Sequence, residues 1–180
     1  TDYEAMDMDP ILSSALDVYA DESTVKDESG DTLTIKSSDD NIRKILRNLF
    51  YDVLNIEYNL WPWVRNCCKY GDFYLHLDID EEVGIVNVTP LSAYEIRREE
   101  MFDEKNPYAV KFFYEGLNNV GGIGQGGQQT EMEPFEMAHF RLLSDTNFLP
   151  YGKSMMEGAR KIYKQLTLME DAMLLHRIMR

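Results

Sequence analysis

The chain has 180 residues, 44% of them hydrophobic, and a formal net charge of −14 at pH 7. That length suits one domain with a real core, and the sequence shows no secretory signal and no apolar run near the ~18 residues that span a bilayer. Residues 1–40 contain twelve acidic and two basic residues, whereas residues 151–180 contain six basic and three acidic ones. The sequence has no basic patch that could displace counterions from phosphates, so tight DNA binding is excluded.

Residues 1–40 are predicted to form an acidic helix followed by a hairpin. Asp9 before Pro10 predicts a helix cap and a first helical position. The apolar residues of that helix share one face: Ile11, Leu12, Ala15, Leu16 and Tyr19. Val25, Leu33 and Ile35 flank a predicted turn at Ser29–Gly30, which indicates a small hairpin.

Residues 41–71 are predicted to be helical, with Asp39 or Asp40 as the first cap. The apolar stripe follows i, i+3, i+4, i+7 spacing and predicts a core-facing helix: Ile42, Ile45, Leu46, Leu49, Phe50, Val53 and Leu54. A second helix follows a break near Asn55, with a kink or a new start at Trp61–Pro62 and a cap at Gly71. The adjacent Cys67 and Cys68 are predicted to be partly buried free thiols in a reducing cytoplasm.

Residues 72–143 are predicted to be mainly β. Alternation from Phe73 to Ile79 predicts a strand whose solvent-facing side carries Tyr74, His76, Asp78 and Asp80. A turn at Glu81–Gly84 returns the chain as a hairpin ending near Pro90. Further strands are predicted at Ala109–Tyr114 and Met137–Leu143. The glycine-rich loop 116–129 reads either as a mobile surface loop or as an engineered splice. It lacks the lysine and the following helix that a phosphate-binding loop needs.

Catalytic, cofactor-binding and metal sites are not predicted. Asp78 and Asp80 share a strand face and, with Glu81 and Glu82, could suggest a metal-dependent nuclease. A solvated hairpin turn explains this cluster better, because no lysine follows it nearby, no partner histidine is evident, and the cluster is predicted to lie at a hairpin tip. The histidines are scattered, and no serine or cysteine arrangement marks a nucleophile: His76, His139 and His176.

After a corner at Pro150–Gly152, Lys153–Ser154 are predicted to open one long helix over residues 153–180. It carries two apolar stripes, more than packing on one side requires, so one stripe is a candidate subunit interface. The candidate interface residues, including an aromatic anchor on an earlier helix, are Trp61, Leu168, Ala172, Leu175 and Met179. The other stripe comprises Ile162, Leu166, Met169 and Met173.

The predicted fold class is α+β, a single domain over residues 1–180 with helices packed on a small antiparallel sheet. The chain starts at Thr1 and is still helical in pattern at Arg180, so we expect a piece of a larger protein. We expect this piece alone to associate weakly and in a concentration-dependent way.

Three segments carry a resemblance: YEAMDMDPILSSALDVYADE at 3–22, NIRKILRNLFYDVLNIEYNLWPWVRNCCKYGDFYLHLDI at 41–79, and HFRLLSDTNFLPYGKSMMEGARKIYKQLTLMEDAMLLHRIMR at 139–180. They resemble the portal proteins of tailed bacteriophages, the contractile-tailed type above all. The resemblance implies the wing region of a structural subunit, with its long helix leading into the portal stem. It also implies a homo-oligomeric ring of about twelve copies at one capsid vertex, a head-tail connector with a DNA channel for packaging and ejection.

The partners implied by this resemblance are the major capsid protein, the terminase large subunit, neck or head-completion proteins, and double-stranded DNA passing without sequence-specific binding. The implied location is the virion, and the host cytoplasm during assembly; no cofactor, enzymatic activity or membrane is implied. Two other hypotheses remain open: a non-viral adaptor or scaffold domain, and a metal-dependent nuclease.

Overall fold

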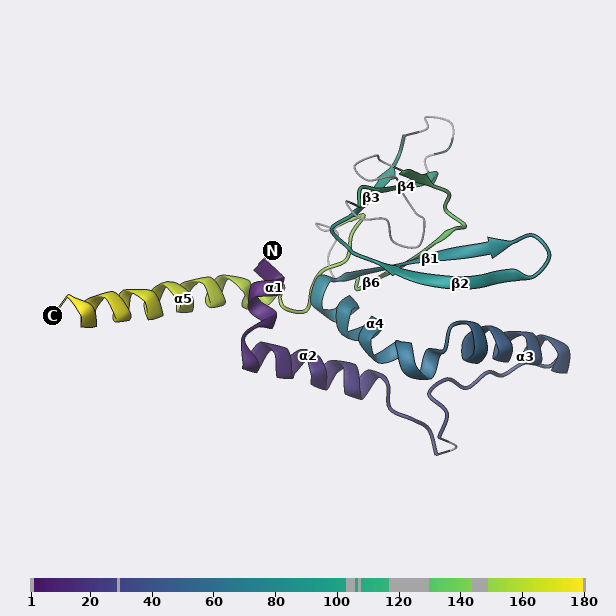
Figure 1. Ribbon diagram of the computed structural model, residues 1–180, viewed down its shortest axis with the longest axis horizontal. Coiled ribbons are helices and arrows are strands. Elements are labelled where there is room, and N and C mark those ends of the chain that lie inside the picture. The colour runs from purple at the N-terminus through teal and green to yellow at the C-terminus, as the bar shows by residue number, and fades with distance from the viewer. Residues whose placement is uncertain are drawn as a thin grey trace.

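The computed structural model describes residues 2–28, 30–102, 106, 108–116, 130–143 and 149–179. Helices form one layer and antiparallel strands lie over it, while the final helix projects away from both (Figure 1). The α+β class with a long final helix is therefore confirmed. The predicted single small sheet is instead two sheets of three strands each.

The chain begins with two helices, α1 (Asp2–Asp7) and α2 (Pro10–Ser23). The Asp9 carboxylate accepts hydrogen bonds from the backbone N–H groups of Ile11 and Leu12, at 2.9 and 3.2 Å, so the predicted cap is confirmed. Leu16 and Ala20 are buried on α2, whereas Ile11 is 78% exposed. The buried face is thus narrower than the predicted stripe.

The predicted hairpin between Thr24 and Asp39 is wrong in its strands, while Ser29 of its predicted turn lies outside the described residues. The described residues between Thr24 and Asp39 form turns and bends but no strand, and Val25 is exposed instead of paired. A side chain from a later element holds this segment, because the Tyr51 hydroxyl donates to the carbonyl oxygen of Leu33 at 2.7 Å. The polar, acidic composition offers too little apolar surface to pack a two-stranded ribbon.

The next helical stretch comprises α3 (Asp40–Arg47) and the π-helix η1 (Asn48–Val53). The Asp39 cap is confirmed, since its Oδ1 accepts from the N–H of Asn41 at 2.8 Å. The predicted core-facing stripe is wrong, because none of the described residues of α3 or η1 is buried. Ile42 and Ile45 are exposed, at 50% and 67%, whereas the later stripe residues are half-buried. The π-helix ends with Leu54 N–H bonded to the Leu49 carbonyl at 2.9 Å.

Helix α4 (Ile56–Tyr70) is the central helix of the lower layer. Asn55 precedes it in the left-handed region at φ 45°. The helix runs through Pro62 without a new start, and it ends at Gly71, at φ 85°, whose N–H bonds to the Cys67 carbonyl at 2.8 Å. The predicted break and cap are confirmed, whereas a new helix start at Pro62 is wrong.

The two cysteines near the end of α4 are free thiols, one half-buried and one buried, as predicted. Burial is the main reason that the pKa of Cys67 rises to about 11. Burial also raises the pKa of Cys68. Both thiols therefore stay protonated and weakly nucleophilic at neutral pH.

The first sheet has the strand order β2-β1-β6, formed by β2 (Gly84–Leu91), β1 (Asp72–Asp80) and β6 (Met137–Arg141). The second has the order β3-β4-β5, formed by β3 (Ile96–Glu100), β4 (Val110–Tyr114) and β5 (Thr130–Met132). The predicted β1–β2 hairpin and the strands that became β4 and β6 are confirmed. Strands β3 and β5 were not predicted.

A core lies between the two sheets and explains one wrong prediction. Tyr74 was placed on a wet face of its strand, yet it is fully buried. Its face is covered by the second sheet, so both faces of β1 are buried over its first residues. This core consists of Tyr74, Leu91, Ile96, Phe112, Tyr114, Met132 and Met137.

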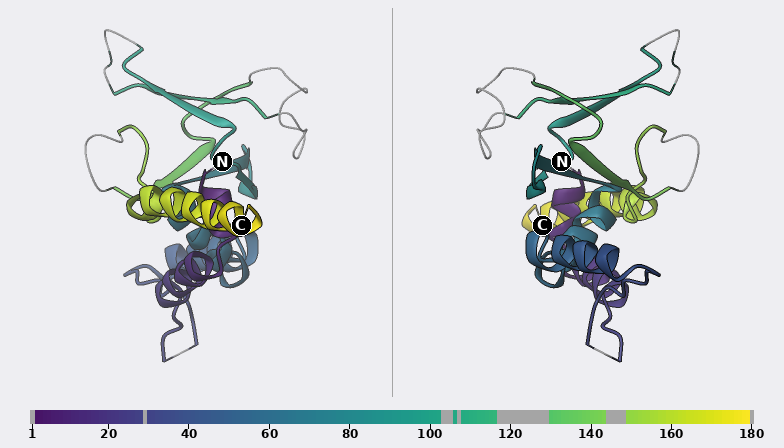
Figure 2. Two further views of the ribbon diagram at one scale, coloured as in Figure 1. Left: turned by 90° about the vertical axis from the view of Figure 1, so that its left-hand side faces the viewer. Right: turned by 90° about the vertical axis from the view of Figure 1, so that its right-hand side faces the viewer.

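A second core joins the helices to the start of α5 (Glu157–Ile178). Met6 of α1, Leu16 of α2, Cys68 of α4 and Met156 form its buried centre. Figure 2 shows the molecule from both ends, with the sheets above and the helices gathered below. The N-terminal helices therefore hold the base of the projecting helix.

Candidate subunit interface

The projecting helix starts later than the sequence predicted. Pro150 and Tyr151 form the expected corner, but α5 begins at Glu157 instead of Lys153–Ser154. Ser154 is buried and fixes this entry: its hydroxyl donates to the Lys69 carbonyl at 2.6 Å and accepts from the N–H of Met156 at 3.1 Å. The segment before α5 is thereby tied to the end of α4.

Two glycines allow this segment to cross the α4–β1 junction at backbone contact. A Cβ on Gly152 would lie 2.0 Å from the Gly71 carbonyl oxygen, and a Cβ on Gly71 would lie 2.5 Å from the carbonyl carbon of Lys153. The Gly71 carbonyl accepts from the N–H of Leu142 at 2.8 Å, and the Leu142 carbonyl accepts from the N–H of Lys153 at 2.9 Å. The position of α5 therefore depends on a backbone crossing that leaves no room for a side chain at Gly71 or Gly152.

A buried polar cluster braces the same junction against both sheets. The Asp72 carboxylate accepts from Gly152 N–H at 2.9 Å and contacts His139 Nε2 at 2.7 Å. Arg98 Nη1 lies 2.8 Å from His139 Nδ1. Because a guanidinium can only donate, Nδ1 accepts from Arg98 and Nε2–H donates to Asp72. His139 also stacks on Tyr74, with ring centroids 4.3 Å apart.

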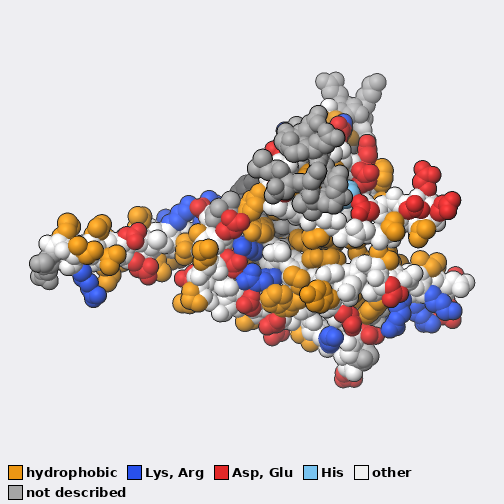
Figure 3. Space-filling view, viewed as in Figure 1, with side chains coloured by type: hydrophobic (Ala, Val, Ile, Leu, Met, Phe, Trp, Pro, Cys, Tyr) orange, Lys and Arg blue, Asp and Glu red, His pale blue; other side chains and the backbone are white. Residues whose placement is uncertain are grey.

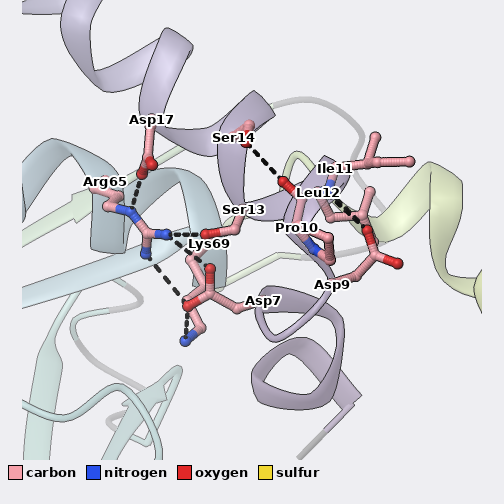
Figure 4. A network of polar contacts seen from close by, with 10 residues as sticks. All are labelled: Asp7, Asp9, Pro10, Ile11, Leu12, Ser13, Ser14, Asp17, Arg65 and Lys69. Atoms are coloured by element: carbon pink, nitrogen blue, oxygen red, sulfur yellow. Dashed lines mark hydrogen bonds and ion pairs between the residues drawn. The ribbon is translucent and has the colours of Figure 1, made fainter.

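An ion-pair network joins α1, α2 and α4 (Figure 4). Arg65 Nη2 lies 2.8 Å from Asp7 Oδ1 and 3.0 Å from the Ser13 hydroxyl, and its Nε lies 2.6 Å from Asp17. Lys69 Nζ lies 2.7 Å from Asp7 Oδ2. The hydrogen bonds from Arg65, followed by those from Lys69, lower the pKa of Asp7 to about 2. The network keeps α1 in place beside the base of α5.

Contacts from α1 cover only the beginning of α5. Asp2 pairs with Arg160 and Lys164, at 2.5 and 2.6 Å, and Tyr3 hydrogen-bonds Glu157. The Tyr163 hydroxyl donates to the Ala5 carbonyl at 3.0 Å. Beyond Lys164 every described side chain of α5 is exposed, and hydrophobic side chains are spread along the projecting arm in Figure 3.

The predicted interface residues on α5 are all exposed. Leu168 is 69% exposed, Leu175 56% and Met179 79%, and Ala172 is also exposed. The structure does not group them with Trp61, which is half-buried on α4 and donates from its indole nitrogen to Asp21 of α2 at 2.7 Å. Trp61 is thus held by its own chain, while the α5 residues form a free apolar surface.

An open apolar groove lies between the η1–α4 helices and the β1–β6 face of the first sheet. We call it the α4–β6 groove; its volume is about 240 Å³. Sequence reasoning missed it because its lining comes from four separate elements and the linker between η1 and α4. The lining residues are Phe50, Leu54, Ile56, Leu60, Trp63, Val64, Cys67, Phe73, Leu75 and Phe140.

The acidic hairpin tip forms local turn contacts. Asp80 accepts from the N–H groups of Glu82 and Val83, at 2.9 and 3.1 Å, and Asp78 accepts from the Asn87 amide at 2.9 Å. The pairing of β1 with β2 is irregular between Asp78 and Ile79. Across the part of the chain that the structure describes, no group of three or more His, Cys, Asp or Glu is placed to hold a metal ion.

The three histidines lie apart, as their sequence positions suggested. His139 belongs to the buried cluster at Asp72, His76 lies on β1 with Asp78 3.3 Å away, and His176 is exposed on α5. Positions 117–129 of the predicted glycine-rich loop, and positions 144–148, lie outside the described residues. Among the described helices, none is long and apolar enough to cross a membrane.

The described surfaces of this protein suit assembly better than catalysis. They include a projecting helix with exposed apolar side chains, an apolar groove, and carboxylates that are bonded within their own turn. The chain belongs to the family Bacteriophage T4-like portal protein (Gp20), whose sequence profile matches residues 1–180. Members of this family have a structural role in phages. A comparison with individual curated proteins found no match.

Proposed function

We propose that this chain is a structural subunit of a portal ring of about twelve copies at one capsid vertex, through which DNA is packaged and ejected. The observation that carries the proposal is α5, whose apolar side chains remain exposed beyond Lys164 although its base is rigidly clamped. A fixed helix with an uncovered apolar surface fits a subunit that is completed by its neighbours.

The charge distribution fits passage of DNA better than its retention. The net charge of −14 repels phosphates over most of the surface, and a channel needs DNA to slide without tight phosphate contacts. We propose that double-stranded DNA passes the assembled ring without sequence-specific binding. Neither a hydrolytic activity nor a cofactor forms part of this function.

The same role requires particular neighbours in the particle. We propose contacts with the major capsid protein around the vertex, with the terminase large subunit during packaging, and with neck or head-completion proteins afterwards. The location that follows is the virion, preceded by the host cytoplasm during assembly. Membership of the portal family supports these partners, and each contact can be tested separately.

Immunogold labelling of phage particles that contain this chain tests the proposal. Antibodies raised against residues 157–178, and separately against residues 10–23, are expected to label a single vertex on both filled and emptied heads. Antibodies against the major capsid protein serve as the control and should label every face. Label spread over the whole shell, or none on purified or gently opened particles, would contradict the portal role.

A further inference from the structure

The apolar walls of the α4–β6 groove continue beyond it, toward the tip of the β1–β2 hairpin. On the sheet wall, Phe73 and Leu75 line the groove. Leu77 lies on the same face, because side chains alternate along a strand, and it pairs opposite Val88 of β2. Leu77 and Val88 are only half-buried, so this part of the sheet face lacks a full cover.

The helix wall is formed by α3 and η1, residues 40–53, which we call the α3–η1 arm. Phe50, in the inner half of the arm, lines the groove. Leu46 is half-buried, and Ile42, about one turn further out, is 50% exposed. Among the described residues of the arm none is buried. The cover over the arm therefore decreases toward its outer end, although its apolar side chains continue there.

The joint between the arm and α4 has two features of a hinge. Asn55 has a φ of 45°, in the left-handed region, which residues other than glycine adopt uncommonly. The arm ends in a π-helix at Val53, a form that often occurs at functional sites. Hinges absorb large backbone changes at a few residues between elements. A rotation at Leu54–Asn55 therefore moves the arm as a unit and leaves α4 in place.

The outer helix of the arm carries unpaired positive charge. Arg43 pairs with Asp40 of the same helix. Lys44 and Arg47 form no ion pair with any residue that the structure describes. Arg47 lies over the ring of Tyr51, 5.1 Å from its centroid, and keeps its charge. Two cations of α3 are thus free to attract an acidic surface.

The hairpin at the same end of the molecule carries the opposite charge. α3 and the β1–β2 hairpin both extend on the side away from α5, with the hairpin above α3 (Figure 1). Asp78 is bonded to Asn87, and Asp80 to N–H groups of its own turn. Glu81 and Glu82 are exposed and form no ion pair within the described part of the chain. Unpaired charges of opposite sign attract over a distance that the salt concentration sets.

We propose that the α3–η1 arm is a hinged flap that closes over the α4–β6 groove, turning at Leu54–Asn55 toward the acidic hairpin tip. The structure describes the open arrangement. Low ionic strength favours closure, because the Debye length grows from about 3 Å at 1 M salt to about 30 Å at 0.01 M. Closure shields the apolar lining of the groove from water. The movement takes place within one copy and goes beyond the proposed role in the ring.

The fluorescence of Trp63 tests the flap, because Trp63 lines the groove and the chain has one other tryptophan, Trp61. In a Trp61→Phe background, the uncharged quencher acrylamide should reach Trp63 more easily as NaCl rises from about 0.01 M to about 1 M. A low protein concentration limits association during the measurement. A Trp63 quenching constant that does not change with salt would overturn the flap.

Charge reversal separates the flap from a general effect of salt. Lys44→Glu with Arg47→Glu places like charges on both sides of the gap, so quenching should be high at every salt concentration. Glu81→Lys with Glu82→Lys, added to that variant, restores opposite charges and should restore the rise with salt. A combined variant that is folded by circular dichroism and shows no such rise would contradict the proposal.

The matched control is Glu133→Lys with Glu170→Lys. It changes the net charge by the same amount as the hairpin substitutions do, at exposed positions just after β5 and on α5. Its Trp63 quenching should rise with salt as it does in the parent chain. Loss of the response in this control would mean that net charge, and not the facing pair of surfaces, governs access to the groove.

A zero-length carbodiimide cross-linker gives an independent readout in the wild-type chain, since it joins an amine only to a carboxylate that it touches. Lys44 should be joined to Glu81 or Glu82 within one chain at low salt, and this product should be lost at high salt. Mass spectrometry of the monomer band identifies the linked peptides. Cross-links of Lys44 to these residues between chains only would assign the contact to a second copy and sink the flap. The vertex labelling is independent of each of these results.

Discussion

The backbone of Gly152 lies directly against the carbonyl group of Gly71, at the point where the chain enters the projecting helix. A Cβ added to Gly152 would lie 2.0 Å from the Gly71 oxygen and 2.8 Å from its carbonyl carbon. Both atoms belong to the backbone, so neither can move aside as a flexible side chain would. This contact couples the end of α4 to the direction in which α5 leaves the molecule.

The first prediction follows from that contact. Gly152→Ala should lower the free energy of unfolding by about 1–3 kcal/mol, the usual cost of overpacking, because the backbones must separate. Gly158→Ala is the control: a Cβ there meets no atom within 4 Å, so the change should be neutral or stabilise α5 by up to about 1 kcal/mol. Urea denaturation measures both. Equal midpoints for the two variants would show that the crossing is not tight.

The second prediction concerns the Asp7 network. Asp7→Asn removes the charge that Arg65 and Lys69 surround, and it should cost about 2 kcal/mol at pH 7, as expected for a pKa lowered from 3.8 to about 2. Because the folded pKa lies below the unfolded one, this stabilisation is present above pH 4 and disappears as the pH falls toward 2. The difference between wild type and variant should therefore shrink on acidification.

Glu22→Gln is the control for this acid dependence, since Glu22 is exposed at the end of α2. Denaturant unfolding at several pH values gives the three curves. The stability difference between wild type and Asp7→Asn should narrow between pH 4 and pH 2, while the Glu22→Gln curve should follow the wild type. A difference that stays constant across this range would mean that Asp7 is not paired in the folded state.

The features that the sequence predicted correctly were those determined by local chemistry. The Asp9 and Asp39 caps, the Gly71 cap and the β1–β2 turn each depend on a few adjacent residues. The errors concern what covers a surface. Tyr74 alternates like a solvent-facing residue, yet a sheet built partly from unpredicted strands buries it. A local sequence pattern does not show which distant element will pack on a strand face.

The candidate interface also contains features that the sequence could predict and features that it could not. Helical spacing alone identified Leu168, Ala172, Leu175 and Met179 as surplus apolar residues, and the structure leaves them exposed. Trp61 was grouped with them because aromatic residues concentrate at interfaces, but its indole is engaged with Asp21. The groove and the Asp72–His139–Arg98 cluster combine residues far apart in the chain, so only the fold shows them.

The third prediction is that the purified chain cleaves neither plasmid DNA nor ATP in the presence of Mg²⁺ or Mn²⁺. Asp80 is occupied by backbone N–H groups of its turn and Asp78 by Asn87, so the pair is not arranged as a two-metal site. Gel electrophoresis and phosphate release provide the measurements. Metal-dependent cleavage that disappears in the Asp78→Ala plus Asp80→Ala variant would overturn the structural role.

The fourth prediction compares two leucines that the sequence placed on equally apolar helix faces. Leu16 is 2% exposed in the second core, so Leu16→Ala should cost about 2–5 kcal/mol. Leu46 is only half-buried on α3, where no described residue is buried, so Leu46→Ala should cost about 1 kcal/mol. Chemical denaturation at low protein concentration measures both without contributions from association. If Leu46→Ala proved as costly as Leu16→Ala, the α3 face would have to be covered in solution, and the half-buried position of Leu46 would be wrong.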